Sequence, residues 1–585
     1  MSVFCASVSA RGRKWQVRSP ANVPVNAYSL PSGALVHPSV VDIVARRGFT
    51  DMSAYFEPSL RNLMPNPSSM TGMDQATKLF CEAVSSGRRI AILGDYDVDG
   101  ATSTATLLRY LRLIGTTDAI FHIPQRLTEG YGPNIPAVES LYEQGARLLM
   151  IVDSGTTAFG PIERAVELGM DVIVLDHHEP PSDGILPPAV IVNPKRSEDD
   201  GTLSYLCTAG LAMMFLVSVN RYLRAENFFD ERGVSEPVLQ NLMGLTALGT
   251  VADLVPLVGL NRAFVTLGLT RMSSIPGIQA LSDARQETEF SAKTCGFVFG
   301  PCINAGGRIS DTRQGSQLLS TDDIDEAKSI AERLVALNNE RKDMQTAMTD
   351  ACIDSLSKTE LSDVIVVHNE EWHPGVVGLV ASRILDQFDR SAVVIGAGGK
   401  GSGRAVGGFN IGQAFMSAVE KGLLLKGGGH AAAGGLTLQP GMLDAFVRHM
   451  NEAAEGCERP PATVDVAWSI RDLSLDVVEG FEYMAPFGMG NEKPRIAIVD
   501  GIIQNVRILK EAHISGFLVL PDGSARVKFI LFYAVGTPLG EAICNAEGNF
   551  ADMMGHVSPN TYNGVTSVQL VPTDVMIGGK ATASS

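Results

Sequence analysis

Three aspartates at alternate positions form the first group of potential metal ligands in this sequence. Asp95, Asp97 and Asp99 lie within the segment Gly94–Gly100. Carboxylates at this spacing can converge on one divalent cation when the chain turns. An EF-hand loop begins in the same way, but it needs a Glu at its twelfth position, where this chain has Thr106. The residues before the segment also favour a strand over a helix, so the sequence predicts a metal site of another kind.

Three more groups of polar residues follow apolar stretches further along the chain. Asp153 follows one such stretch, Asp176 precedes the pair His177 and His178, and Asp253 follows another. A lone Asp at a strand end is more often a helix cap than a ligand, and an isolated His-His pair is as often part of a plain surface loop. Because Asp and His recur at several strand ends, one shared site is the simpler explanation.

Continuous apolar runs precede these polar groups, as is typical of buried parallel strands. We expect strands at 89–93, 148–152 and 172–175, and helices at 101–113 and 161–168. Ligands of parallel α/β sheets bind beyond the carboxyl ends of the strands. The aspartates that follow these three strands should therefore meet at one edge of the sheet.

The second half of the chain has a different pattern. Periodic apolar residues predict one long helix at 321–357, which could bridge two lobes. A second α/β stretch follows, and beyond Pro460 short alternating strands with turn signals predict a small β-barrel or sandwich. The α/β stretch is expected to contain strands at 364–367 and 392–395, a helix at 375–385, a glycine-rich end at 427–435 and a helix at 440–458.

Length and charge limit the classes of protein that remain. A chain of 585 residues suggests three or four domains. With 47 basic and 64 acidic residues the net charge is −17, which disfavours a protein that coats nucleic acid through bulk positive charge. A local basic groove or a metal-holding acidic site is still compatible with this balance. An apolar content of 45% argues against global disorder.

Targeting signals and cysteine spacing point to the cytoplasm. The longest apolar run, 209–219, is too short to cross a bilayer, and residues 1–20 contain no signal-peptide core. None of the eight cysteines forms a C-x-x-C pair, so neither a zinc knuckle nor a dense disulfide framework is expected. We therefore expect a protein of the reducing cytosol with no membrane partner.

Taken in order, these segments resemble the DHH phosphoesterase superfamily, and later motifs narrow the resemblance to RecJ-like exonucleases specific for single-stranded DNA. The resemblance covers about residue 70 to about residue 540. The family's usual Pro after Gly-Asn is displaced to Pro494, and residues 1–20 match no known pattern. The motifs are DYDVDG, VDSGTT, LDHH, GTVADLVPL, GPCINAGGR (300–308), GVVG (375–378), GSGR (401–404), GGGHAAAGG (427–435, similar to the DHH-associated domain) and PFGMGN (486–491, similar to the start of the oligonucleotide-binding barrel).

The resemblance implies an α/β architecture with two α/β lobes, DHH and DHH-associated, joined by a long helix and followed by a C-terminal OB-like β-barrel. The expected parts are an N-terminal extension and lead-in (1–70), the DHH catalytic domain (71–318), the connecting helix (319–358), the DHH-associated domain (359–458), the OB-like nucleic-acid-binding domain (459–575) and a disordered tail (576–585).

The resemblance also implies a site with two Mn²⁺ or Mg²⁺ ions. Such a pair stabilises the attacking and leaving oxygens of an in-line displacement and lowers the pKa of a bound water. Asp153 is best placed to bridge the ions, His178 should face the scissile phosphate, and Asp176 should orient an imidazole more than bind metal. Asp97, Asp153 and His178 are the expected catalytic residues. The expected metal ligands are Asp95 or Asp97, Asp99, Asp153, His177 and Asp253.

Basic and polar residues with small neighbours form the expected phosphate-binding set. Arg308 follows two glycines and Arg404 follows Ser402-Gly403, so backbone and guanidinium can both approach a phosphate. Without the motif, a surface ion pair would be the more common role for either Arg, and His430 could contact a phosphate or only cap the fold. Gly399-Lys400 lacks its Walker partners, which disfavours a nucleotide-triphosphate site. The full set is Arg126, His178, Asn304, Arg308, Ser402, Arg404 and His430.

The C-terminal barrel combines cations with aromatic residues. Such a mixture suits a groove that follows phosphates and stacks bases, although the aromatics could simply fill the core, and for Phe529 and Phe532 we expect the core. The residues concerned are Lys510, Phe517, Arg526, Lys528, Phe529, Phe532 and Tyr533.

The resemblance implies a metal-dependent exonuclease that degrades single-stranded DNA 5′ to 3′ and releases 5′-mononucleotides. The sequence does not distinguish DNA repair, DNA recombination and a phage's own replication as its pathway. We expect a monomer, with single-strand-binding protein or a helicase as partner. One alternative is another DHH phosphodiesterase acting on short oligonucleotides or cyclic dinucleotides, which would lack the barrel motif. The other is an inactive DNA-binding replication subunit, which the intact acidic and His positions disfavour.

Overall fold

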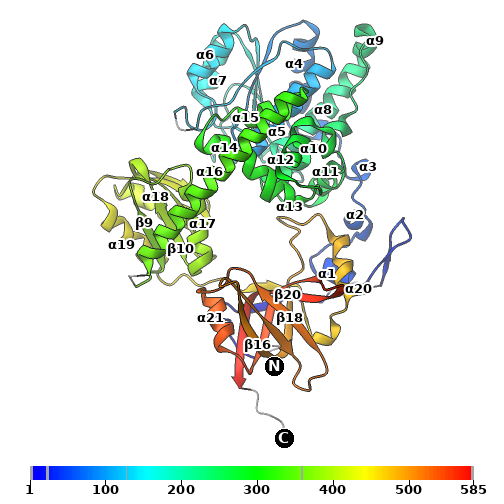
Figure 1. The fold of residues 1–585 in the computed structure, drawn as a ribbon. Helices are drawn as coiled ribbons and strands as arrows, with labels where there is room; N and C mark the ends of the chain where they lie inside the picture. Colours follow the sequence, from blue (N-terminus) through cyan, green and yellow to red (C-terminus); the bar gives the residue numbers. More distant parts are fainter. Residues whose placement is uncertain (1–3, 21–25, 127, 358–359, 581–585) are drawn as a thin grey trace. The chain divides into compact units, whose positions relative to one another are not determined.

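The chain folds into two compact units. The computed structural model describes residues 4–580 except 21–25, 127 and 358–359. One unit, here the site unit, contains Ser53–Arg341 and Pro486–Glu492. The other, here the barrel unit, contains Met1–Met52, Lys342–Ala485 and Lys493–Ser585. The elements of both units are labelled in Figure 1.

The site unit is built on a five-stranded sheet with the order β5-β4-β6-β7-β8, in which every pair of neighbours is parallel. The predicted strands are confirmed at β4, β6 and β7. The strands are β4 (Ile90–Leu93), β5 (Ile120–His122), β6 (Leu148–Val152), β7 (Asp171–Leu175) and β8 (Val190–Val192).

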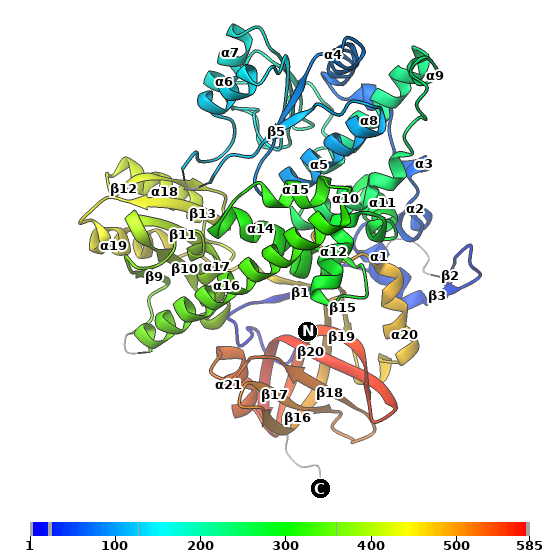
Figure 2. The ribbon, with the colours of Figure 1, turned by 45° about the horizontal axis from the view of Figure 1, so that its top comes forward.

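Helices cover both faces of this sheet, as Figure 2 shows. Ile90 and Ile92 pack into a core with α4 and α8, whereas Ala91 and Leu93 pack into a core with α6 and α7. Successive strand residues point to opposite faces, so burial on both faces explains the unbroken apolar runs of the sequence. The helices are α4 (Met73–Ser85), α6 (Ile135–Glu143), α7 (Phe159–Glu167) and α8 (Thr208–Ala225).

Two helices of the site unit begin or end at predicted aspartates. Helix α5 (Val98–Leu113) starts three residues before the predicted position, because Asp97 caps it and accepts hydrogen bonds from the N–H groups of Asp99 and Gly100. Helix α10 (Met243–Ala252) ends at Asp253. The long helix predicted at 321–357 is α16 (Ile324–Leu356), and the division between the units falls within it.

The barrel unit contains a second five-stranded sheet, ordered β12-β13-β11-β10-β9, in which only β9 and β10 are parallel. The predicted strands near 364 and 392 and the helices near 375 and 440 are all present. The elements are β9 (Val364–His368), α17 (Val377–Phe388), β10 (Ser391–Ile395), β11 (Lys400–Arg404), α18 (Ile411–Glu420), β12 (Leu424–Gly429), β13 (Ala433–Leu438) and α19 (Leu443–Ala454).

The predicted C-terminal barrel is present, and pairing between β16 and β19 closes it into five strands. Its strands are longer than the short ones expected, with 14, 14 and 16 residues in β16, β19 and β20. The expected disordered tail at 576–585 is wrong for 576–580, which continue β20, and 581–585 lie outside the described residues. The strands are β15 (Val466–Trp468), β16 (Ile496–Leu509), β17 (His513–Val519), β18 (Arg526–Leu531), β19 (Asn549–Tyr562) and β20 (Val565–Lys580).

The N-terminal segment is integrated into the barrel unit. Strand β1 (Trp15–Val17) pairs in parallel with β14 (Ala462–Val464), and the Trp15 indole N–H donates to Asp574 at 3.0 Å. The segment expected as one lead-in, residues 1–70, is divided between the two units, because residues up to Met52 belong to the barrel unit and the site unit begins at Ser53. Among the described residues no helix is both long and apolar enough to cross a bilayer, and all eight cysteines are free thiols.

Candidate metal centre

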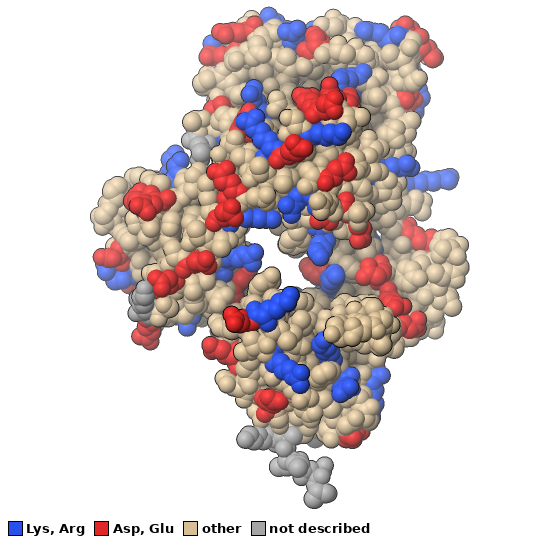
Figure 3. Space-filling model, in the orientation of Figure 1, with Lys and Arg blue, Asp and Glu red and all other residues tan. Residues whose placement is uncertain are grey.

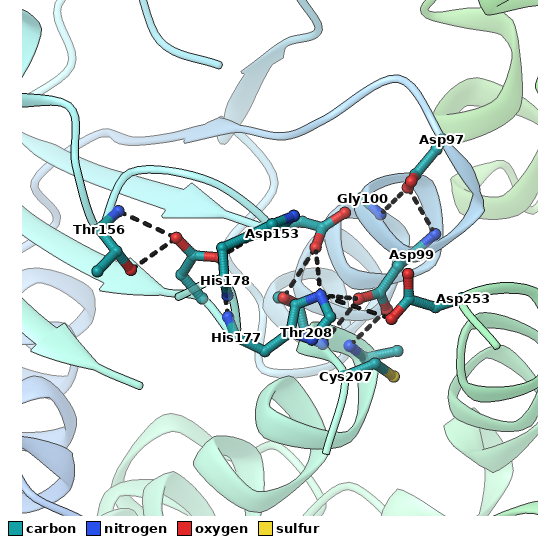
Figure 4. Close-up of polar contacts among 12 residues, drawn as sticks. Asp97, Asp99, Gly100, Asp153, Thr156, His177, His178, Cys207, Thr208 and Asp253 are labelled. Atoms are coloured by element: carbon teal, nitrogen blue, oxygen red, sulfur yellow. Dashed lines mark hydrogen bonds and ion pairs between the residues drawn. The ribbon is translucent and has the colours of Figure 1, made fainter. Parts of the chain in front are cut away.

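The ends of three strands bring the predicted aspartates to one edge of the site-unit sheet. Asp95 lies two residues beyond β4, and Asp153 and Asp176 lie directly beyond β6 and β7. Asp153 has a left-handed backbone, with φ of 62°, and its N–H donates to the Leu175 carbonyl at 3.0 Å. Left-handed non-glycine residues are uncommon outside turns and functional sites. This turn aims the Asp153 carboxylate toward the other acidic groups (Figure 4).

Asp253 reaches the same place from a helix. The apolar stretch before it is helix α10, which packs against α5 and α8, and Asp253 forms the C-cap of this helix. An apolar run of this length is compatible with a buried helix as well as a buried strand. The residue after it, Leu254, has a φ of 57°, so the backbone leaves the helical conformation directly after Asp253.

The six predicted ligands form overlapping groups that could each hold a metal ion. Within each group the potential ligand atoms lie within 4.8 Å of one another. Asp153 and His177 each belong to two groups, so the groups form one continuous centre. The groups are Asp95 with Asp97 and Asp153, Asp99 with His177 and Asp253, and Asp153 with His177 and His178.

His177 lies among three carboxylates. Its Nε2 atom is 3.5 Å from Asp153 Oδ1, 3.5 Å from Asp253 Oδ2 and 3.9 Å from Asp99 Oδ2. Burial lowers the pKa of His177 despite these negative neighbours. The neutral imidazole that this favours is the form that binds metal ions.

The carboxylates of the centre repel one another. Burial and then the charge of Asp97 raise the pKa of Asp95, and burial and then the charge of Asp99 raise the pKa values of Asp153 and Asp253. Asp95 Oδ1 and Asp253 Oδ2 are buried without a hydrogen-bond partner among the described residues, although buried polar atoms are nearly always satisfied. Oxygen ligands with one imidazole suit Mn²⁺ or Mg²⁺, so the donor set fits divalent cations.

The N-terminus of α8 holds Asp99 in place, a contact that the sequence analysis missed. The N–H groups of Thr208 and Ala209 donate to the two oxygens of Asp99 at 2.7 and 2.8 Å. The Thr208 hydroxyl donates to Asp153 Oδ1 at 3.1 Å. The partial positive charge of a helix N-terminus favours a carboxylate there, and each Asp99 oxygen keeps a second lone pair for a cation.

Asp176 orients His178, as predicted for a residue that holds an imidazole. His178 Nδ1 donates to Asp176 Oδ1 at 2.7 Å, and Thr156 donates to Oδ2 through its N–H and its hydroxyl. Burial alone would raise the pKa of Asp176, but these hydrogen bonds hold it below its usual range. Burial alone would lower the pKa of His178, but the hydrogen bond and charge of Asp176 outweigh it, so this pKa is raised. The Nε2 side of His178 is therefore kept available as a donor.

Two tyrosines beside the metal centre were not predicted. The Tyr131 hydroxyl donates to the Asp153 carbonyl at 3.2 Å and lies 3.2 Å from His178 Nε2. The Tyr96 ring packs edge-on against Tyr131, and the Arg126 guanidinium lies 5.2 Å from the centre of the Tyr96 ring. Tyr96 lies inside the DYDVDG motif, so its place in the sequence could have identified it as a residue of the site. Arg126 is thus placed next to the acidic loop.

Helix α14 (Gly300–Ile309) brings Arg308 to the same side. A Cβ atom on Gly307 would lie 3.3 Å from the Tyr96 carbonyl oxygen, so this glycine allows the helix to pack directly on the acidic loop. The Arg308 charge is close enough to act on the Tyr96 hydroxyl. Asn304 lies one turn earlier on the same face of α14. Arg126, Asn304 and Arg308 therefore all belong to the site unit.

The other three predicted phosphate-binding residues form a separate group in the barrel unit. Ser402 and Arg404 are two residues apart on β11, so their side chains lie on the same face of the second sheet. A Cβ atom on Gly378 would lie 3.3 Å from both the Ser402 hydroxyl and the Arg404 guanidinium, which leaves a narrow space lined by polar groups. His430 is exposed in the turn between β12 and β13, where its N–H donates to the Ala433 carbonyl.

The barrel has a groove of ≈ 490 Å³ that carries cations and aromatic rings. The Arg526 guanidinium lies 4.9 Å from the centre of the Phe517 ring, and both line the groove with Lys528 and Tyr562. Phe529 is fully buried, as predicted. The prediction that Phe532 is a core residue is wrong, because its side chain is 56% exposed just beyond the end of β18.

The face of the molecule drawn in Figure 3 has, among the described residues, no continuous basic surface that could attract DNA. On the face drawn in Figure 3, Lys and Arg side chains are interspersed with Asp and Glu. Any attraction of a polyanion at this face must therefore come from particular groups of residues. The groups described above are the candidates.

Comparisons with known proteins agree with this geometry. Three family models match the chain: the DHH family N-terminal domain at residues 89–250, the DHHA1 domain at 361–456 and the RecJ OB domain at 464–574. Single-stranded-DNA-specific exonuclease RecJ of Escherichia coli (strain K12) is 32% identical over 507 residues, which cover 83% of this chain and 87% of that protein. RecJ of Bacillus subtilis (strain 168) is 31% identical over 584 residues, with coverage of 96% and 71%.

A solved structure is similar over nearly the whole chain. The crystal structure of RecJ in complex with Mn²⁺ from Thermus thermophilus has a TM-score of 0.75 and 28% sequence identity, and the match covers 92% of this chain and 76% of that one. The crystal structure of RecJ in complex with Mg²⁺ from the same organism has a TM-score of 0.69 and 27% identity, with coverage of 93% and 75%.

Proposed function

This chain belongs to the RecJ family of single-stranded-DNA-specific exonucleases, and from that premise we propose how its own residues carry out the reaction. It is a metal-dependent exonuclease of single-stranded DNA. The proposed direction is 5′ to 3′, with release of 5′-mononucleotides. The observation that carries the proposal is the meeting of five aspartates and His177 in overlapping ligand groups at one sheet edge.

Two groups of residues would each hold one Mn²⁺ or Mg²⁺ ion. Asp95, Asp97 and Asp153 would hold the first, and Asp99, His177 and Asp253 the second. The contacts of Asp153 with both groups support it as the bridging ligand. When bound, two such ions activate a water and stabilise the charge that develops on a phosphodiester. The buried oxygens of Asp95 and Asp253, which no described residue hydrogen-bonds, support this assignment.

His178 is proposed to contact the scissile phosphate. Asp176 fixes its ring through Nδ1, which leaves Nε2 as the donor, and the raised pKa favours the charged imidazole. Tyr131 lies beside the same nitrogen and holds the Asp153 carbonyl. A charged donor at this position would stabilise negative charge on the phosphate oxygens.

The phosphate-binding residues are proposed to set the direction of digestion. Arg126, Asn304 and Arg308 lie on the Tyr96 side of the metal centre, where a phosphate at the 5′ end could be held. Ser402, Arg404 and His430 of the barrel unit are proposed to contact phosphates as well. The groove with Phe517 and Arg526 is proposed to bind the strand without reading its sequence.

The setting of the reaction is part of the same proposal. Eight free thiols suit a reducing cytosol, where we place the protein. Action as a monomer, and contact with single-strand-binding protein or a helicase, stay predictions. The match to the RecJ OB domain at 464–574 disfavours a phosphodiesterase of short or cyclic nucleotides, and the intact ligand set disfavours an inactive subunit.

A digestion series tests the proposed direction. Single strands labelled at the 5′ end or the 3′ end are incubated with the protein and Mn²⁺, or with EDTA. The proposal predicts immediate release of a labelled mononucleotide from the 5′ label, late release from the 3′ label and no reaction in EDTA. Early loss of the 3′ label, or equal rates in EDTA, would contradict it.

A further inference from the structure

Seven residues of the C-terminal half fold as part of the site unit. The chain leaves the barrel unit after Ala485, contributes Pro486–Glu492 to the site unit and returns at Lys493. We call residues 486–492 the inserted loop. This loop, which the structure describes in full, contributes to none of the groups that could bind a metal ion, so its place in the site unit needs another explanation.

Hydrogen bonds within the inserted loop give it a fixed shape. The backbones of Gly488 and Asn491 exchange two hydrogen bonds, of 3.1 and 3.2 Å. The Asn491 side chain is fully buried, and its Nδ2 donates to the Pro486 carbonyl at 2.9 Å. Gly490 has a φ of 69°, a conformation that glycine adopts without strain. The loop therefore packs as one preformed turn.

A buried tyrosine and arginine fix the inserted loop to the site unit. The Tyr55 hydroxyl donates to Asn491 Oδ1 at 2.8 Å. The Arg262 guanidinium stacks 4.3 Å from the centre of the Tyr55 ring and donates to the Tyr55 carbonyl at 2.9 Å and to the Pro486 carbonyl at 3.5 Å. Tyr55 and Arg262 are each 3% exposed. Loss of any of these buried hydrogen bonds should loosen the attachment of the inserted loop.

The other side of the inserted loop packs against the segment that follows Asp253. The Leu257 N–H donates to the Met489 carbonyl at 2.7 Å. A Cβ atom on Gly490 would lie 3.0 Å from Pro256 Cβ, and one on Gly488 would lie 2.7 Å from Leu257 Cδ1. The loop thus contacts the chain three and four residues beyond Asp253.

Asp253 depends on this packing more than the other proposed ligands do. Asp95 and Asp153 follow central strands of the sheet, and the α8 N-terminus holds Asp99. Asp253 instead ends a helix, and the left-handed Leu254 directly after it begins the segment that the inserted loop covers. The direction in which the chain leaves α10 is therefore set at Pro256 and Leu257.

We propose that the inserted loop positions Asp253 for metal binding, with Tyr55, Arg262 and Asn491 as positioning residues. Through this loop the C-terminal half contributes to the metal centre without supplying a ligand. The inference rests on the proposed function, because the position of Asp253 affects the reaction only if Asp253 binds a metal ion. Residues that orient a ligand typically change metal affinity by about 10- to 100-fold when mutated.

Two matched single-atom deletions test the inference. Tyr55→Phe removes the hydroxyl that donates to Asn491. Tyr110→Phe removes an equally buried hydroxyl that donates to Asn220 Oδ1 at 2.7 Å, near the far end of α5 from Asp99. Both variants of the full-length protein are titrated with Mn²⁺ by calorimetry, and their thermal unfolding is followed without metal.

Both variants should lose similar thermal stability, because each removes one buried hydrogen bond from a Tyr hydroxyl to an Asn side chain. Only Tyr55→Phe should weaken Mn²⁺ binding, by about tenfold, and its rate at saturating Mn²⁺ should return toward that of the wild type. Unchanged Mn²⁺ affinity in Tyr55→Phe, or an equal loss in Tyr110→Phe, would overturn the inference. If the wild type itself binds no Mn²⁺, the proposed metal centre fails and the inference with it.

A double variant tests whether the loop acts through Asp253. Asp253→Asn alone should weaken Mn²⁺ binding. Adding Tyr55→Phe should cause no further loss if the two residues act as one unit. A further loss as large as in the wild-type background would show that the loop acts elsewhere, and would overturn the assignment.

Discussion

Buried aspartates have opposite surroundings in the two units. In the barrel unit, Asp465 accepts hydrogen bonds from Arg18 at 3.1 Å and from Arg47 at 2.8 Å. Burial opposes these cations, yet the pKa of Asp465 is lowered. In the site unit, Asp95 and Asp153 have raised pKa values because burial and neighbouring carboxylates act together.

This contrast separates a structural use of buried charge from a functional one. A buried carboxylate is costly unless a positive partner is present. The barrel unit supplies that partner from its own sequence, and Asp465 joins the N-terminal segment to the start of the barrel. The site unit gathers five aspartates into one centre. Within the described part of the chain, three of them pair with His177, and none of the five pairs with an arginine or lysine. We propose that divalent cations supply the missing positive charge.

The largest expected effect comes from the site unit. Asp153→Asn keeps the size of the side chain but removes the charge shared by two ligand groups, so the rate of DNA hydrolysis should fall by about two or more orders of magnitude. Unfolding in the absence of metal should be unchanged or shifted to higher temperature, because one repulsive charge is gone. A residual rate above about a tenth of the wild type, equivalent to ~1.4 kcal/mol, would contradict the bridging role.

The matching substitution in the barrel unit, Asp465→Asn, should lower stability and leave the rate of hydrolysis nearly unchanged. Asp465→Asn removes the charge that pairs with the buried Arg47 and the partly exposed Arg18, which should cost about 3 kcal/mol of unfolding free energy. The rate per folded molecule at saturating Mn²⁺ should be nearly unchanged. Chemical denaturation and a rate measurement on the same sample check this. A variant as stable as the wild type would remove the contrast between the units.

The pH dependence of stability should follow from the same residue. Because the folded-state pKa of Asp465 is lowered, its contribution to stability is complete above its unfolded value of about 3.9 and is lost as pH falls toward the folded value. Asp465→Asn should therefore lose more stability at about pH 6 than at about pH 3.5. Equal losses at both pH values would contradict the ion pair as its cause.

A smaller effect is expected from Arg308, the proposed phosphate contact beside Tyr96. Arg308→Ala should reduce the preference for a 5′-phosphorylated strand over a 5′-hydroxyl strand by roughly 10-fold, the value of a charge-assisted hydrogen bond. Arg164→Ala, which removes exposed ion pairs with Glu139 and Glu167, is the matched control. An unchanged preference in Arg308→Ala, or an equal loss in Arg164→Ala, would exclude this contact.

The smallest expected effect lies in the barrel groove. Arg526→Ala should weaken binding of long single strands slightly and lower the slope of log affinity against log salt by about 0.7, the value of one phosphate contact to a single strand. Arg471→Ala, which breaks an exposed pair with Asp522, serves as the control. An identical salt slope for Arg526→Ala and the wild type would remove the groove from the proposed DNA path.

The parts of the molecule that were predictable are those with local signals. Strands buried on both faces leave continuous apolar runs, so β4, β6 and β7 and the aspartates after them could be predicted from the sequence. Asp253 was identified as a residue after an apolar stretch, but a short apolar run does not show whether a buried helix or a buried strand precedes it. Phe532 was assigned to the core together with Phe529, although residues three apart on a strand point to opposite faces and β18 ends at Leu531.

The parts that could not be predicted depend on contacts between distant segments. Thr208 and Ala209 contact Asp99 more than a hundred positions away, and their own sequence resembles any apolar helix start. Tyr131 reaches His178 only because two loops meet at the sheet edge. The inserted loop carries a recognisable motif, but nothing in the motif indicates that it folds with the site unit.

The number of Mn²⁺ ions bound per chain tests the central claim most directly. The claim is that the aspartates of the site unit lack cations because two divalent ions supply them. Calorimetric titration of the full-length protein, freed of metal with EDTA and dialysed, should give two Mn²⁺ ions per chain, and Asp153→Asn should lose at least one of them. No Mn²⁺ binding by the wild type, or equal stoichiometry in Asp153→Asn, would contradict the claim.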